Sequence, residues 1–338
     1  MVSNVNDNGS HYRQQVERVT RPTGTRRGAW LLAVLAVVAP SASCGGPPDG
    51  TADSLTVVVT TTPLGDLVRN VVGEAATVEV LMPVGADAHE FQLSAEQVAR
   101  LATADLVVVN GLGLEARMED ALETIDGAKV LALAPLLDPQ PFDLDASSEP
   151  CDPTASQDDH EGDACDPHVW TDPLRMVDAA RIVGRRLDQL DPSADFSARA
   201  DEYAAELMRA DSEITEILSV VPAGSRKIVT NHEALSYFAR RYELDVIGVV
   251  IPGGSTLAAP SSAELAALVD VIEEAGARAI FAETVEQSAL AEAVASEVGD
   301  DVSVVELYTE SLGEPGSGAD SLIGMLVTNA RRIAEALE

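Results

Sequence analysis

Short hydrophobic runs alternate with amphipathic stretches along most of the chain. Runs rich in β-branched residues predict strands, and segments with apolar residues three and four positions apart predict helices between them. The predicted strands cover 55–61, 77–81, 106–110, 129–133, 227–230, 245–251, 279–282 and 302–306. Strands that alternate with helices usually pair in parallel. The pattern therefore predicts an α/β fold with two similar lobes, each a mainly parallel four-stranded sheet flanked by helices.

A long helical pattern separates the two groups of strands. One helix is predicted over 172–190, and a charged, alanine-rich pattern follows up to residue 221. Its apolar face carries Phe196, Tyr203, Leu207, Ile214 and Leu218. About thirty helical residues would extend roughly 45 Å, which is enough to join two lobes and to limit their motion. The alternative is a peripheral helix without a mechanical role.

The N-terminal segment has the pattern of an export signal. Five arginines precede the uncharged run 30–39, which as a helix would span only about 15 Å, half of a bilayer core. The residues Ser41-Ala42-Ser43-Cys44 resemble the lipobox of bacterial lipoproteins, which implies cleavage before Cys44 and a lipid on its thiol. An ordinary secretory cleavage is the alternative. We expect an extracytoplasmic protein, lipid-anchored to the outer face of the cell membrane or held in the periplasm.

These patterns divide the chain into consecutive parts. They are a signal peptide at 1–43, a lipid-anchored flexible tether at 44–54, an N-terminal α/β lobe at 55–190 with an acidic insert at 143–166, an interlobe helix at 191–222 and a C-terminal α/β lobe at 223–338.

The charge balance excludes one class of partner. The 338 residues include 22 Lys and Arg against 56 Asp and Glu, a formal net charge of -34. A nucleic-acid-binding protein needs basic side chains against the phosphates, so we expect no nucleic-acid partner. The acidic residues are spread along the whole chain, which favours a role in solubility over a role in a binding site.

Three of the five histidines lie in predicted loops of the α/β layers. His89, His168 and His232 each follow a predicted strand, and Asp320 lies between the last strand and the C-terminal helix. Loops at the carboxyl ends of parallel strands meet at one edge of a sheet. If these side chains converge, three imidazoles and one carboxylate form a closed tetrahedral set suited to Zn²⁺, without an open position for a reactive water.

Each of these residues also has a structural alternative. His89 and His168 could be loop histidines bonded to backbone groups, and His232 could lie at the surface near the start of a helix predicted over 233–242. Asp320 could cap the C-terminal helix.

Six motifs occur in order over 55–337. They are Val80-Leu81-Met82-Pro83 up to His89; Ala104-Asp105-Leu106 up to Asn110-Gly111-Leu112-Gly113-Leu114-Glu115; Asp166-Pro167-His168-Val169-Trp170-Thr171-Asp172-Pro173; Asn231-His232 up to Tyr237-Phe238-Ala239; Ala279-Ile280-Phe281-Ala282-Glu283; and Asp320-Ser321 up to Met325. In this set the chain resembles the zinc- and manganese-binding substrate-binding lipoproteins of ABC transporters. One departure is Ala88, where that family generally has proline.

The resemblance implies both a function and a ligand set. It places His89, His168, His232 and Asp320 on the four metal-ligand positions and the segment 191–222 on an interlobe rod. Manganese-binding members usually carry Glu at the position of His232, so the third imidazole favours zinc, with Mn²⁺ as the alternative. Glu233 and Glu283 are carboxylates that could orient an imidazole N–H.

The implied protein is a monomer that captures Zn²⁺ between its lobes and delivers it to an ABC permease and its ATPase. It is not an enzyme. The competing hypothesis is an exported zinc-dependent hydrolase, which would need an open coordination position and a general base such as Glu233 or Glu283. A third is a surface-binding lipoprotein with a structural metal. The sequence contains no HExxH motif.

Two cysteines bracket the acidic insert. In an oxidising compartment, Cys151 and Cys165 are expected to form a disulfide, and the alternative is a thiolate site with His160. With His160 as its only histidine, the insert is expected to be a disordered acidic loop rather than a strong second metal site.

Overall fold

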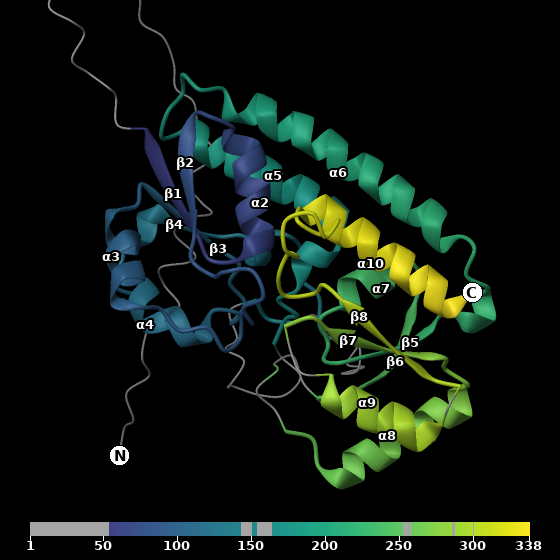
Figure 1. The fold of residues 1–338 in the computed structure, drawn as a ribbon. Coiled ribbons are helices and arrows are strands. Elements are labelled where there is room, and N and C mark those ends of the chain that lie inside the picture. The colour runs from purple at the N-terminus through teal and green to yellow at the C-terminus, as the bar shows by residue number, and fades with distance from the viewer. Residues whose placement is uncertain are drawn as a thin grey trace, which may run out of the picture. The chain divides into compact units, whose positions relative to one another are not determined.

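The computed structural model describes residues 54–142, 151–153, 164–252, 256, 259–285, 288–299 and 301–338. The expected signal peptide, the lipidation site Cys44 and most of the acidic insert lie outside these residues. Residues 54–338 belong to one compact unit. Eight strands in this unit form two four-stranded sheets, each flanked by helices (Figure 1).

The first sheet lies in the N-terminal half of this unit. Its strands are β1 (Leu55–Val59), β2 (Ala76–Val80), β3 (Leu106–Val109) and β4 (Val130–Ala132). They pair in parallel in the order β2-β1-β3-β4. The side chains of Val57, Val58 and Val59, and all four residues of β3, are buried. A continuous apolar run is expected where helices or loops cover both faces of a parallel sheet.

The second sheet repeats this arrangement in the C-terminal half. Its strands are β5 (Lys227–Thr230), β6 (Asp245–Val249), β7 (Ala279–Glu283) and β8 (Ser303–Leu307). They are parallel in the order β6-β5-β7-β8. The predicted fold of two similar lobes is therefore confirmed, and each predicted strand is present to within two residues at either end. In both sheets the second strand pairs on one side of the first strand, β1 or β5, and the third strand pairs on its other side. Such a reversal of strand order leaves a crevice at the carboxyl ends of the strands.

Capping side chains fix the helices of the first lobe. These helices are α2 (Thr62–Val72), α3 (Ala95–Thr103), α4 (Glu119–Leu122) and α5 (Pro173–Asp188), with the short 3₁₀ helices η1 (Ala116–Met118), η2 (Gly127–Lys129), η3 (Ala134–Leu136) and η4 (Val169–Thr171). The Thr61 hydroxyl caps α2, and Ser94 and Gln97 form a capping box on α3. Asp172 caps α5 by accepting the N–H of Leu174 at 2.8 Å, so the ligand-bearing segment before it ends in a fixed turn.

The helices of the second lobe cover its sheet on two sides. They are α7 (Ser236–Arg241), α8 (Ser262–Ala275), α9 (Ala289–Val298) and α10 (Leu322–Leu337), and the 3₁₀ helix η5 (Ala223–Ser225) precedes β5. Figure 1 shows α8 and α9 on one side of the sheet and α10 on the other. The helix predicted over 233–242 is shorter than expected and begins at Ser236. The Thr230 hydroxyl donates to the carbonyl of His232, and the residues that follow form bends.

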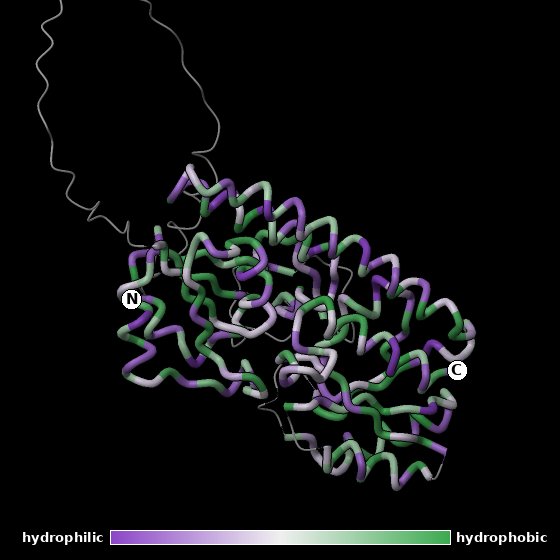
Figure 2. The backbone as a smooth tube through the Cα atoms, turned by 45° about the horizontal axis from the view of Figure 1, so that its top comes forward, coloured by the Kyte–Doolittle hydropathy of each residue, from purple (hydrophilic) through white to green (hydrophobic). Residues whose placement is uncertain are grey.

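Helix α6 (Phe196–Leu218) packs against α5 and α2 of the first lobe and against α10 of the second. The five apolar residues predicted for its inner face are buried. In Figure 2 its tube alternates between hydrophilic and hydrophobic colours, as expected of a helix with one solvated face. At about 35 Å, this helix is shorter than the helix predicted over 191–222. It begins at Phe196, where the carboxylate of Asp188 accepts the backbone N–H of that residue.

The largest hydrophobic cluster joins buried apolar residues of both lobes, and each lobe also has a smaller cluster of its own. The largest cluster includes Val57 of β1, Leu207 of α6, Phe281 of β7 and Met325 of α10. Among the described residues, every helix is too short or too polar to cross a bilayer.

Candidate metal centre

Three imidazoles converge between the two sheets. The Nε2 atom of His168 lies 3.3 Å from Nε2 of His89 and 3.3 Å from Nε2 of His232. All three residues are buried. The structure thus brings together three of the four residues that the sequence predicts as ligands.

The carboxylate in this cluster is Glu310, and the prediction of Asp320 is wrong. The Oε1 atom of Glu310 lies 3.3 Å from Nε2 of His168 and 3.7 Å from Nε2 of His232, and its Oε2 lies 4.0 Å from Nε2 of His89. One donor atom from each of the four residues falls within 4.8 Å of the others. Asp320 is exposed and accepts the N–H of Gly316 at 2.9 Å.

The capping alternative for Asp320 is not observed either. The hydroxyl of Ser321 caps α10 by accepting the N–H of Gly324. Sequence reasoning missed Glu310 because no recognised motif contains it. The signal that could have found it is its place three residues beyond the end of β8, at the carboxyl edge of the sheet.

Strand ends position three of the four side chains, and the start of a 3₁₀ helix positions the fourth. His89 lies in the loop after β2, His232 follows β5 by two residues, and Glu310 follows β8. His168 immediately precedes η4, which leads into α5. Two donors therefore come from each lobe, and they meet near the two reversals of strand order.

Carboxylates fix the orientation of two imidazoles. The Nδ1 atom of His168 pairs with Asp166 at 2.7 Å, and Nδ1 of His232 pairs with Glu283. In the neutral imidazole each Nδ1–H donates to its carboxylate, which leaves the lone pair of Nε2 directed into the cluster. Glu283 thus occupies the orienting place considered for it. Glu233 is buried next to His232 in the chain, and its predicted orienting role stays a prediction.

The charges around the cluster shift the pKa values in opposite directions. Burial lowers the pKa of His89 to about 3. Burial would also lower the pKa of His168, but the charges of Asp166 and Glu310 raise it to about 10. Glu283 raises the pKa of His232 against the effect of burial. Although burial disfavours its charge, the histidines, His168 first, lower the pKa of Glu310 to about 2.

The donor set fits a divalent cation. Neither side-chain oxygen of the buried Glu310 has a hydrogen-bond partner among the described residues. Burial of a carboxylate is costly, and a cation placed between it and neutral imidazoles would compensate its charge. Four ligands placed tetrahedrally 2.0 to 2.1 Å from zinc would lie about 3.3 Å apart. The observed separations of 3.3 to 4.0 Å are close to that value.

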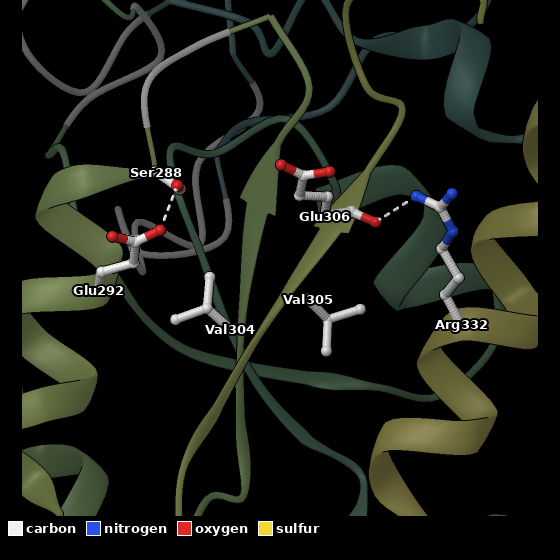
Figure 3. Close-up of a pocket in the computed structure, with 6 residues that line it drawn as sticks. All are labelled: Ser288, Glu292, Val304, Val305, Glu306 and Arg332. Carbon is white, nitrogen blue, oxygen red and sulfur yellow. Dashed lines mark hydrogen bonds between the residues drawn. The ribbon is translucent and has the colours of Figure 1, made fainter.

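A surface pocket of about 410 Å³ lies elsewhere, along the edge strand β8 (Figure 3). It is lined by Ser288, Glu292, Val304, Val305, Glu306 and Arg332. No member of the histidine cluster lines it. The guanidinium of Arg332 donates to the carbonyl of Glu306 in this pocket. Because no lining residue belongs to the cluster, the pocket has no direct part in the candidate centre.

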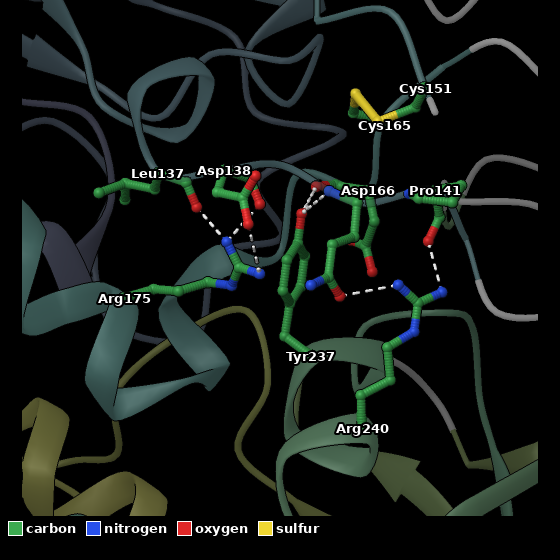
Figure 4. The surroundings of a disulfide bond; sticks show 10 residues. Leu137, Asp138, Pro141, Cys151, Cys165, Asp166, Arg175, Tyr237 and Arg240 are labelled. Carbon is green, nitrogen blue, oxygen red and sulfur yellow. Dashed lines mark hydrogen bonds and ion pairs between the residues drawn. A yellow bond between two sulfur atoms is a disulfide. The ribbon is translucent and has the colours of Figure 1, made fainter. Parts of the chain in front are cut away.

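The predicted disulfide between Cys151 and Cys165 is present, with the Cα atoms 5.1 Å apart (Figure 4). It joins the two ends of the acidic insert directly before Asp166, the partner of His168. The alternative thiolate site is therefore not formed. His160 lies outside the described residues.

Two parallel-sheet lobes that enclose three imidazoles and a carboxylate define a metal-binding receptor. Residues 57–336 match the model of one protein family, ZnuA, described as the periplasmic zinc-uptake complex component A. The chain belongs to this family. It is a metal-binding substrate-binding protein, and the family functions with an ABC permease and ATPase. The prediction that it is not an enzyme is confirmed, because the family is a transport receptor.

Individual relatives are similar over nearly their full length. The manganese-binding lipoprotein MntA of Bacillus subtilis is 30% identical over 320 residues, 92% of this chain and 100% of the relative. The zinc-binding protein TroA of Treponema pallidum is 29% identical over 299 residues, 86% of this chain and 92% of the relative. A solved structure of periplasmic TroA has a TM-score of 0.72 at 28% identity, covering 84% of this chain and 99% of TroA.

Proposed function

We propose that this protein captures Zn²⁺ with His89, His168, His232 and Glu310 and delivers it to an ABC permease for uptake. The observation that carries this proposal is the convergence of three imidazole Nε2 atoms and one carboxylate at a buried point between the lobes. Imidazole is a donor well suited to zinc, and a carboxylate completes a closed set of four. A closed set favours holding the ion over reacting with it.

Manganese is the alternative cargo, since relatives are named for either metal. Mn²⁺ prefers oxygen donors, whereas this cluster offers three nitrogens and one carboxylate. The donor set therefore supports zinc. Relative affinity does not decide between them, because a site of this kind generally binds Zn²⁺ more tightly than Mn²⁺ whichever ion it carries in the cell. Uptake measurements decide: deletion of a zinc receptor lowers zinc uptake, and deletion of a manganese receptor lowers manganese uptake.

The direct test of the function is calorimetric titration of metal-free protein with zinc. We expect one tight site per chain, weakened by orders of magnitude in His168→Ala and unchanged in His160→Ala, a histidine that the proposal does not use as a ligand. Stoichiometric zinc binding that survives substitution of His89, His168 and His232 would refute the proposal. In cells, deletion should impair growth in zinc-depleted medium, and added zinc should restore it.

We also propose that the mature protein is a monomer, lipid-anchored through Cys44 on the outer face of the cell membrane. The lipobox-like sequence before Cys44 supports this, as do relatives named as lipoproteins. Mass spectrometry should find a lipid-modified N-terminal Cys44. In Cys44→Ser the modification should be absent and the protein should leave the membrane fraction.

A further inference from the structure

The two neighbours of Glu310 both form hydrogen bonds to the opposite lobe, one of them buried and one part-buried. On one side, the carbonyl of Thr309 accepts the indole N–H of Trp170 at 2.7 Å. On the other, the hydroxyl of Ser311 accepts the backbone N–H of Gly85 at 2.8 Å. Thr309, Ser311 and Trp170 are each at most 2% exposed. The segment that carries Glu310 is thus tied to the first lobe before and after the carboxylate.

The partners of these bonds lie in the segments that carry the first-lobe histidines. Trp170 follows His168 by two residues, and its ring contacts the imidazole edge-on at 5.3 Å between centroids. Gly85 precedes His89 by four residues. Each bond therefore connects Glu310 to one of the two imidazoles that it faces across the lobes.

Further contacts strengthen the connection at both ends. Thr62, at the start of α2, accepts the N–H of Leu312 at 2.9 Å, and its hydroxyl lies 3.2 Å from that of Ser311. The Thr309 hydroxyl donates to Glu283 at 2.7 Å, and Glu283 holds His232. The tripeptide 309–311 therefore contacts the surroundings of all three histidines.

We infer that Thr309, Ser311 and Trp170 form a clasp that keeps Glu310 across the cleft and so sets the rate at which the metal leaves. This inference rests on the proposed function and adds positioning residues to it. An ion held by two donors from each lobe is released when the two donors of one lobe move away from it. Glu310 can move away only after the hydrogen bonds of the clasp break. None of the three clasp residues belongs to the set of four donors, so loss of the Trp170 or Ser311 hydrogen bond changes release without removing a ligand.

The test is the rate at which zinc-loaded protein loses its ion to excess chelator. Ser311→Ala removes the acceptor for the N–H of Gly85, and Trp170→Phe keeps an aromatic ring beside His168 but removes the indole donor. One neutral hydrogen bond corresponds to about two- to tenfold in an equilibrium or rate. We expect each variant to release zinc faster by about this factor and the double variant to release it faster still, with zinc association nearly unchanged.

The control is Ser303→Ala, because Ser303 is an exposed residue at the start of β8 whose hydroxyl donates to the carbonyl of Arg278 and to no clasp residue. It should release zinc at the wild-type rate. Ser311→Ala that melts earlier without metal but releases zinc at the wild-type rate would show a purely structural role and overturn the clasp. Wild-type protein that binds no zinc would overturn the proposed function, and the clasp with it. Should Trp170→Phe fail to fold, Ser311→Ala decides alone.

Discussion

At the scale of single residues, zinc affinity depends on which carboxylate is the fourth ligand of the cluster. Glu310→Gln removes the charge but keeps the shape, so zinc affinity should fall by about a hundredfold or more, since even the partners of metal ligands are worth ten- to a hundredfold. Asp320→Asn is the matched control. Asp320 is exposed, and its loss should change affinity by no more than about twofold. Calorimetry of both variants checks this, and the opposite ranking would restore Asp320 as the ligand.

Zinc affinity should also depend on pH. Burial opposes a charge on His168, but Asp166 and Glu310 raise its pKa to about 10, and the pKa of His232 is also raised. Without metal the imidazole of His168 is therefore protonated at neutral pH, and zinc must displace that proton, while the raised pKa of His232 strengthens proton competition there as well. His89, with a pKa lowered to about 3 by burial, is already neutral and releases none.

The direction of the pH dependence follows from the competition between zinc and protons for the imidazoles. As the pH falls, protons compete more strongly, so affinity should fall by at least about tenfold per pH unit across the range of about 6 to 8. Competition with a chelator of known pH dependence measures the slope. Calorimetry in two buffers of different ionisation enthalpy counts the protons released. An affinity independent of pH would mean that the imidazoles are neutral before zinc binds.

The resemblance to a known family predicted three members of the cluster but not the fourth, whereas the residues alone left structural alternatives open. Each of the three histidines follows a predicted strand and lies in a recognisable motif, so both position and pattern indicated it. Glu310 lies among several acidic residues, in a chain where carboxylates are common, and only the fold shows which of them is buried. The clasp residue Ser311 was equally invisible, because its partner Gly85 lies 226 residues away.

At the scale of elements, the disulfide should stabilise the fold at the base of the acidic insert. Cys151 and Cys165 are separated by 14 positions, and closing a loop of that length contributes roughly 3 kcal/mol in the chain-entropy model. A reductant should therefore lower the midpoint of urea unfolding. The Cys151→Ala, Cys165→Ala double variant should start from the lower midpoint and show no response to reductant. Equal midpoints for oxidised and reduced wild type would contradict the prediction.

The bounds of the strands were predicted more accurately than the ends of the helices, for a physical reason. A strand in a covered parallel sheet is a short apolar run, and both of its ends are marked by the return to polar residues. Helix ends depend on particular side chains elsewhere. Asp188 determines where α6 begins, and the bond from Thr230 to the carbonyl of His232 accompanies the late start of α7. Neither contact follows from the periodicity of the helix itself.

At the scale of the whole molecule, the two lobes share one hydrophobic cluster that runs through α6 and α10. Two lobes with separate cores would unfold independently, whereas a shared core couples them. Helix α6 contacts α2 of the first lobe and α10 of the second, so neither lobe can lose its packing without exposing apolar surface of the other. We therefore expect the metal-free protein to unfold in a single transition.

Zinc should move that one transition upward without splitting it, because two donors come from each lobe. Ion at a thousand times its dissociation constant adds about 4 kcal/mol to the free energy of unfolding. Scanning calorimetry with chelator and with zinc measures both effects, and His168→Ala should retain the single transition but lose most of the shift. Two separate transitions in chelator would show that the lobes fold independently, and α6 would then be a tether between them and not a part of a common core.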